Sequence, residues 1–150
     1  CTIYFRYYLN QALKVSGLGD QFLDNLQIWR DQMALGLTTW AEMPEPSRSD
    51  CHAWGASPNI EFYRILLGID SDAPGFRKIR IAPSLGKLKE VSGTIPHPLG
   101  SVTAAYKLDE RGEGTARLVL PEGTTGIFIW DGKEIPLKPG EQVISLSLRH

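Results

Sequence analysis

The spacing of apolar residues changes once along the chain, near residue 70, and this change constrains the fold more than any other feature. Before about residue 67 the apolar residues recur every three or four positions, as on one face of an α-helix. From about residue 76 they alternate with polar residues, as on a half-buried β-strand. The turn-rich stretch Asp70–Gly75 separates the two patterns. Helices followed by strands predict an α+β fold.

The first half contains three predicted helical segments. The first covers residues 2–15 and ends at Gly17–Gly19. The second covers residues 21–36, with Asp20 as its N-cap and Gly36 at its C-terminal end. The third covers residues 59–69, with Pro58 in its first turn.

The first helical segment is predicted to have a broad apolar and aromatic face opposite Arg6, Asn10 and Lys14. That face consists of Ile3, Tyr4, Tyr7, Tyr8, Leu9, Ala12 and Val15. On the second segment the apolar positions are Phe22, Leu26, Trp29 and Met33. Three helices in about 66 residues cannot close a large helical barrel, so we expect further helices to cover these faces. The chain also begins with Cys1 and not with Met, and we therefore expect it to be a fragment of a longer protein.

The second half contains about six or seven predicted strands. The pair Asp131-Gly132 stands between two apolar runs, which is a strong signal for a two-residue hairpin turn. Three strands have their apolar residues on one face: Val102, Ala104, Tyr106 and Leu108; Ala116, Leu118 and Leu120; Ile144, Leu146 and Leu148. This pattern predicts an antiparallel β-sandwich.

Composition and motifs exclude several classes of function. The net charge is −1, the pI is about 6.3 and no basic stripe is present, so we expect neither nucleic acid nor a membrane as a partner. No apolar run approaches the ~20 residues of a membrane span. Phosphate-loop, dinucleotide and serine-hydrolase motifs are missing. We predict that the two cysteines, Cys1 and Cys51, are buried thiols.

The segment Thr38–Pro58 joins the second and third helical segments and is long for such a connection. Trp40 and Trp54 can stack on sugar rings or can be core residues that anchor the loop. Glu42 and Glu45 are candidates for the carboxylate pair of a glycosidase, although Pro44 lies between them.

The sequence gives little support to other kinds of catalytic or metal-binding site. Cys51 and His52 are adjacent, so their side chains would face apart and not form a nucleophile–base pair. His52, His97 and His150 match no zinc-ligand spacing, and His97 is predicted to be structural. We expect neither a metal nor a cofactor.

Three runs of sequence carry a resemblance to a known family: Thr-Thr-Trp-Ala-Glu at 38–42, Ser-Asp-Cys-His-Ala-Trp at 49–54, and Phe-Arg-Lys-Ile-Arg-Ile-Ala-Pro at 76–83. Their order and content resemble the C-terminal part of bacterial α-L-rhamnosidases. The resemblance implies an inverting glycoside hydrolase. It also implies that residues 1–70 are the last helices of an (α/α)6 catalytic barrel and that residues 71–150 form a C-terminal β-sandwich.

The resemblance also implies roles for residues of the long join. Glu42 matches the family's general base, although Trp40 stands two residues before it and not immediately before it. His52 matches a histidine of the sugar pocket. Trp40, Trp54, Arg48 and Asp50 are candidate substrate-binding residues because they lie near these positions in the sequence. The family's general acid lies in an earlier part of the barrel, outside this chain.

The implied partners are a rhamnose-containing carbohydrate and the remainder of the barrel. The alternative interpretation is a non-catalytic module, either carbohydrate-binding, with Trp130 and Tyr106 as candidate contacts, or structural. The sequence leaves open whether the parent protein is periplasmic, secreted or cytoplasmic.

Overall fold

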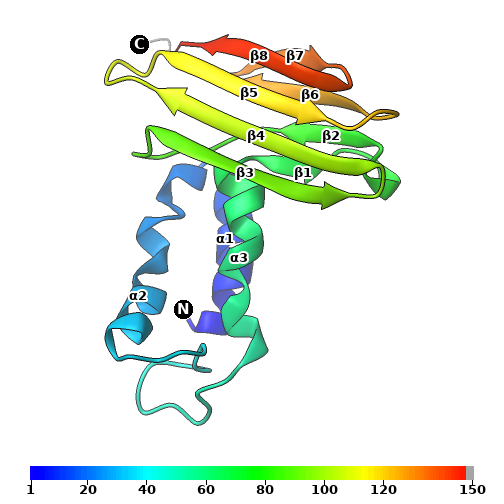
Figure 1. Ribbon diagram of the computed structural model, residues 1–150. Coiled ribbons are helices and arrows are strands. Elements are labelled where there is room, and N and C mark those ends of the chain that lie inside the picture. The colour runs from blue at the N-terminus through cyan, green and yellow to red at the C-terminus, as the bar shows by residue number, and fades with distance from the viewer. Residues whose placement is uncertain (148–150) are drawn as a thin grey trace. The chain divides into compact units, whose positions relative to one another are not determined.

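The computed structural model describes residues 1–147 as two compact units, Cys1–Phe62 and a second that begins at Tyr63. We call them the helical unit and the sheet unit. The helical unit contains α1 (Ile3–Val15), α2 (Gln27–Ala34) and α3 (Pro58–Glu61), and the chain continues from α3 into a π-helical segment, Phe62–Leu66. Figure 1 shows these helices in blue to green along the chain.

Helix α1 begins and ends where local chemistry predicts. The Thr2 hydroxyl accepts the Phe5 N–H at 3.3 Å and so caps the first turn. At the other end, Gly17 has φ +75°, and the Leu18 N–H donates to the Leu13 carbonyl at 2.8 Å. This is the glycine-containing C-terminal motif that satisfies the last helical carbonyls.

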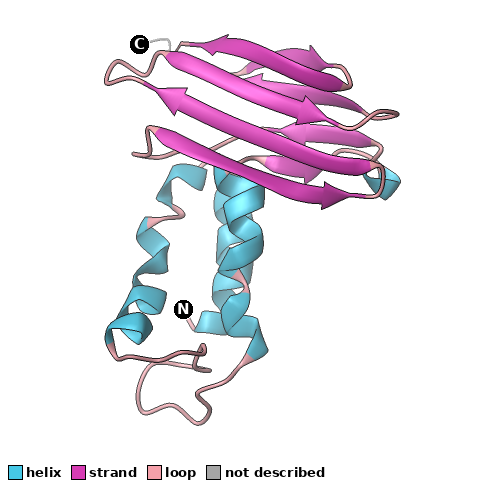
Figure 2. Cartoon of the chain, in the orientation of Figure 1, coloured by secondary structure: helices cyan, strands magenta, loops and turns pink. Residues whose placement is uncertain are grey.

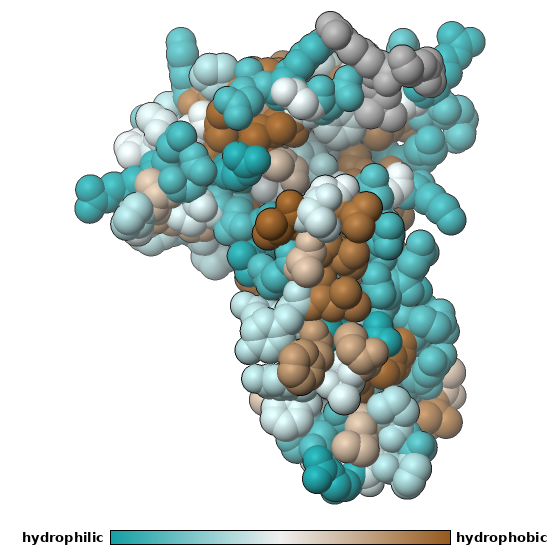
Figure 3. Space-filling view, turned by 180° about the vertical axis from the view of Figure 1, so that it is seen from behind, coloured by the Kyte–Doolittle hydropathy of each residue, from teal (hydrophilic) through white to brown (hydrophobic). Residues whose placement is uncertain are grey.

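The aromatic face predicted for α1 is largely open in this chain, and Asn10, predicted on the opposite, polar side, is buried. The buried residues are Ile3, Asn10 and Leu13, whereas Tyr4, Tyr7, Tyr8 and Val15 are exposed, as is Phe5. A helical side chain is buried only where another segment packs against it. The described part of this chain packs against the side of α1 that carries Ile3, Asn10 and Leu13, so the aromatic side chains stay exposed. In Figure 3, hydrophobic side chains (brown) are likewise open on the surface of the helical unit.

The second helical segment is also shorter than predicted. Residues Gly19–Gln21 and Asp24–Leu26 form separate 3₁₀ turns, and only Gln27–Ala34 is α-helical. Asp20 lies inside the first of these turns and is not an N-cap. Gly36 was predicted correctly, because with φ +80° it follows the end of α2 in the left-handed conformation.

The sheet unit consists of two four-stranded sheets, shown as magenta arrows in Figure 2. One has the order β1-β2-β6-β7 and the other β3-β4-β5-β8. The strands of the first are β1 (Ile69–Ser71), β2 (Lys78–Ile81), β6 (Thr125–Trp130) and β7 (Lys133–Leu137). Those of the second are β3 (Glu90–His97), β4 (Gly100–Leu108), β5 (Gly114–Leu120) and β8 (Gly140–Leu146).

One strand pair departs from the predicted antiparallel arrangement. Strand β2 pairs with β6 in parallel, with Ile79 opposite Gly126, while the other pairs are antiparallel. A parallel pair needs a long crossover, and here the connection from β2 to β6 runs through three strands of the other sheet. The alternation of residues within each strand does not reveal such a crossover.

A single buried cluster joins the two sheets, and the predicted strand faces supply much of it. Val102, Ala104 and Tyr106 of β4 are at most 1% exposed. Tyr106 stacks near Phe128 of the other sheet, with ring centroids 6.4 Å apart. The predicted Asp131-Gly132 turn is confirmed, because it connects β6 to β7 and both residues have positive φ. Of the predicted face of β8, Leu148 lies outside the described residues.

Candidate active site

The segment between α2 and α3 contains the candidate site residues. Apart from the 3₁₀ turn Ala53–Ala56, it has no regular structure and appears as a pink loop in Figure 2. Its two ends nevertheless lie side by side. The His52 N–H donates to the Trp40 carbonyl and the Glu42 N–H to the Ser49 carbonyl, both at 2.8 Å. These bonds bring the three sequence-predicted residues Trp40, Glu42 and His52 together.

Helix α2 anchors the first of these ends. The Gln32 side-chain oxygen accepts the Ala41 N–H at 2.9 Å, and Ala41 is 1% exposed. The buried Trp29 donates its indole N–H to the Gly55 carbonyl at 2.7 Å. Gly55 in turn lies directly against Trp40: a Cβ on this glycine would be 2.4 Å from the Trp40 Cβ. Neither Gln32 nor Gly55 belongs to a recognisable motif, so no role was predicted for either residue.

Glu42 forms a bidentate ion pair with Arg48. The Arg48 Nε donates to Glu42 Oε2 at 3.1 Å, and its NH2 group donates to Oε1. The Glu42 side chain is only 10% exposed, whereas that of Arg48 is 73% exposed. The carboxylate is therefore mostly covered, and the guanidinium lies on its solvent side.

His52 and Trp54 form an aromatic pair that extends to α1. Their ring centroids are 4.0 Å apart, and the Trp54 ring contacts Tyr4 edge-on at 5.3 Å. Trp54 is 39% exposed and Tyr4 is 44% exposed. Within the described residues, the buried His52 Nδ1 has no hydrogen-bond partner. The pair therefore presents an aromatic face, which can stack on a sugar, while the unpaired Nδ1 of His52 is itself covered.

The other carboxylates of the loop are placed differently. Glu45 is exposed, and its Oε2 accepts the Ser47 N–H at 3.2 Å. Asp50 is also exposed, and its contact with the loop is through its backbone carbonyl, which accepts the Thr39 hydroxyl at 2.5 Å. Glu42 is thus the one of the three that is both largely buried and held by a cation.

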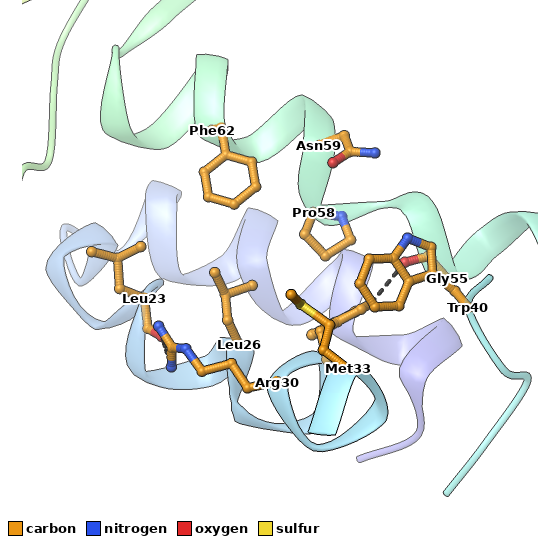
Figure 4. A pocket seen from close by; sticks show the side chains of 10 residues that line it. Leu23, Leu26, Arg30, Met33, Trp40, Gly55, Pro58, Asn59 and Phe62 are labelled. Atoms are coloured by element: carbon orange, nitrogen blue, oxygen red, sulfur yellow. Dashed lines mark hydrogen bonds between the residues drawn. The ribbon is translucent and has the colours of Figure 1, made fainter. Parts of the chain in front are cut away.

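A mainly apolar pocket of about 390 Å³ lies beside this loop. Leu26, Met33, Phe62 and Trp40 line it together with Pro58, as Figure 4 shows. Among the predicted site residues only Trp40 contributes to its wall. The pocket is therefore not the place where Glu42 and His52 would act.

Three further sequence-based predictions can be compared with the structure. Cys1 and Cys51 are free but exposed, so the prediction of buried thiols is wrong. Tyr106 is 1% exposed and cannot be a carbohydrate contact. His97 is structural as predicted: its Nε2 bonds the Phe76 carbonyl at 2.8 Å, and its Nδ1 accepts the Leu99 N–H.

Residues 1–147 contain no cluster of three or more side chains suited to bind a metal ion. Over the same residues, none of the helices combines the length and the apolar character that crossing a bilayer requires.

Comparison with known families identifies the relatives of the chain. Residues 68–141 match the family model of the bacterial alpha-L-rhamnosidase C-terminal domain. The chain resembles the C-terminal part of bacterial α-L-rhamnosidases. The match lies in the sheet unit and includes all of β1 to β7.

Solved α-L-rhamnosidases share this fold. The enzyme from Aspergillus terreus superposes with a TM-score of 0.82 over 93% of this chain at 21% identity. A GH78-family rhamnosidase of Bacillus sp. GL1 (TM-score 0.61, 24% identity) covers 85% of it. The Streptomyces avermitilis enzyme, solved in complex with L-rhamnose (TM-score 0.61, 19% identity), covers 80%.

The chain is much shorter than these rhamnosidases. It spans 18%, 16% and 14% of the three solved chains, respectively. No curated protein matches it. The resemblance to the C-terminal part of the family is thus confirmed, and the catalytic activity of the whole protein is a matter for proposal.

Proposed function

We propose that this chain is the C-terminal part of an α-L-rhamnosidase that hydrolyses terminal α-L-rhamnosyl linkages in glycosides or polysaccharides with inversion. The observation that carries the proposal is the fold similarity to a solved α-L-rhamnosidase over 93% of the chain, which includes the helical unit outside the family match. In this proposal residues 1–70 are the last helices of an (α/α)6 barrel and residues 71–150 a β-sandwich.

Glu42 is the proposed general base. It removes a proton from a water molecule while the water oxygen bonds to the anomeric carbon of rhamnose. The bond between that carbon and the aglycone oxygen breaks, and a general acid in the missing part of the barrel protonates the leaving oxygen. The products are L-rhamnose of inverted anomeric configuration and the free alcohol. The limited exposure of the Glu42 side chain supports this role, because a covered site keeps bulk water away from the base and leaves room for the one water molecule that it activates.

The neighbouring side chains are proposed to hold the sugar. His52 and Trp54 offer an aromatic face, and the Trp40 carbonyl accepts the backbone N–H of His52, which keeps Trp40 next to this pair. Asp50 is exposed in the same loop and is a further candidate contact, whereas the guanidinium of Arg48 is engaged with Glu42. The partners are then a rhamnose-containing carbohydrate and the remainder of the barrel. The exposed aromatic face of α1 supports the second of these.

A second candidate concerns the sheet unit alone. The family match lies in residues 68–141, and the proposed base Glu42 lies outside it, so the sheet unit is proposed to be a module that does not itself catalyse hydrolysis. With Tyr106 buried and Trp130 half-buried, a structural role suits this unit better than carbohydrate binding.

The experiment compares the 150-residue chain with the full-length protein on an aryl α-L-rhamnoside. We expect turnover by the full-length protein only, with the β-anomer of L-rhamnose as the first product seen by NMR. Turnover of the isolated chain at a comparable rate would contradict the half-site proposal. A first product of α configuration would contradict the inverting mechanism.

A further inference from the structure

The Glu42–Arg48 ion pair is bidentate, although one of its partners is exposed to solvent. Two adjacent guanidinium nitrogens engage the two carboxylate oxygens, which is the fork arrangement that fixes the plane of a carboxylate. An ion pair with a solvent-exposed partner contributes little to folding. Arg48 is 73% exposed, so folding energy does not explain why it is held in this orientation.

Short-range bonds hold both partners of the pair in place. The Glu42 N–H donates to the Ser49 carbonyl at 2.8 Å, next in sequence to Arg48. On the other side of Arg48, the Ser47 hydroxyl donates to the same carbonyl at 2.9 Å. The Ser49 carbonyl thus ties the backbone after Arg48 to the backbone of Glu42, and the Ser47 side chain, before Arg48, bonds the same carbonyl.

This arrangement matters for a general base. A carboxylate has about four lone-pair sites, and the fork occupies one on each oxygen. The remaining sites are then fixed in direction, and a water molecule that donates to one of them is held at a defined place. Two guanidinium nitrogens are already committed to Glu42, which leaves Arg48 less suited to bind the sugar itself.

We propose that Arg48 is a positioning residue: it orients the Glu42 carboxylate toward the attacking water and does not contribute to substrate affinity. This inference rests on the proposed function, since it assigns a role toward the proposed base. It replaces the substrate-binding role that the position of Arg48 in the sequence suggested.

The test uses the full-length protein and an aryl α-L-rhamnoside. In Arg48→Ala we expect kcat to fall about 10- to 100-fold, the scale of a misplaced catalytic group, with KM changed less than about threefold. Arg48→Lys keeps the charge without the fork, so its kcat should stay well below that of the wild type. Added guanidinium, tens of millimolar, should recover part of the kcat of Arg48→Ala. Arg111→Ala removes an exposed positive charge from the sheet unit and serves as the matched control, with unchanged kinetics.

Different outcomes separate the two levels of the proposal. A raised KM with unchanged kcat in Arg48→Ala, or full activity of Arg48→Lys, would overturn the positioning role. Glu42→Gln is measured in parallel and should be inactive, without recovery by guanidinium. If Glu42→Gln keeps normal activity, the proposed base itself is wrong, whatever Arg48 does. Thermal unfolding of each variant verifies that the loop mutations leave the protein folded.

Discussion

Gly55→Ala tests the contact that places Trp40 beside the proposed base. Gly55 lies in the 3₁₀ turn Ala53–Ala56 with a backbone outside the left-handed region, so alanine can adopt its conformation. The added Cβ would be 2.4 Å from the Trp40 Cβ and 3.2 Å from its Cγ. To restore van der Waals contact, Trp40 must withdraw by about 1 Å.

The expected cost combines two opposing effects. Overpacking of this kind costs about 1–3 kcal/mol. Replacing glycine with alanine also restricts the unfolded chain, which stabilises the folded protein by about 0.4–1 kcal/mol. We therefore expect the free energy of unfolding to fall by between about 0 and 2.6 kcal/mol, and the 2.4 Å contact favours the upper part of this range. Since Glu42 is two residues from Trp40, kcat of the full-length protein should also fall, by up to about 10²-fold.

Urea denaturation followed by tryptophan fluorescence measures the first effect, and steady-state kinetics on an aryl α-L-rhamnoside measure the second. Ala56→Ser is the matched control, because it adds an atom to an exposed residue of the same turn. If Gly55→Ala leaves both the unfolding free energy and kcat unchanged, Trp40 is not held by this contact and the reasoning is refuted.

Two further predictions concern the sheet unit. Tyr106→Phe removes the hydroxyl that donates a hydrogen bond to the buried Leu67 carbonyl at 2.7 Å. Urea denaturation should therefore show that the free energy of unfolding falls by about 1–3 kcal/mol. Burial raises the pKa of Tyr106, and the wild type should therefore lose stability as the pH rises above the ordinary tyrosine value of about 10, because the unfolded chain deprotonates first; the phenylalanine variant should lack this part of the slope. Gly68→Ala should cost about 3 kcal/mol or more, since a Cβ at φ +72° would be 2.2 Å from the Ala82 backbone. Gly132→Ala has the same φ in open space and should cost only the backbone strain, and equal losses for the two glycines would contradict the steric argument.

Local patterns in the sequence predicted the strands better than the helices. The alternation over Val102, Ala104 and Tyr106 marked a buried face correctly, and the Asp131-Gly132 turn required nothing beyond its two residues. The burial of Asn10 on α1 was not predicted, because spacing shows which residues share a face but not which neighbours exist. Asn10 is buried and Tyr8 is exposed for that reason.

The site was predictable only in part. Resemblance to a family pointed to Glu42 and His52, and the structure brings the backbone of His52 against that of Trp40. The partner of Glu42 was not foreseen, since no spacing rule links a glutamate to an arginine six residues later across two prolines in a loop. Gln32 was missed because its side chain bonds the backbone of Ala41, a partner that residue type does not reveal. Gly55 was missed because it supports the loop through its own backbone carbonyl.

The most direct test of the account is kcat of Glu42→Gln in the full-length protein on an aryl α-L-rhamnoside, with Glu45→Gln as the control from the same loop. Glutamine keeps the shape of the side chain but cannot take a proton from water. We predict a loss of at least about 10³-fold for Glu42→Gln, of the order that general-base catalysis supplies, and kinetics close to wild type for the exposed Glu45. Near-normal turnover by Glu42→Gln would contradict the account.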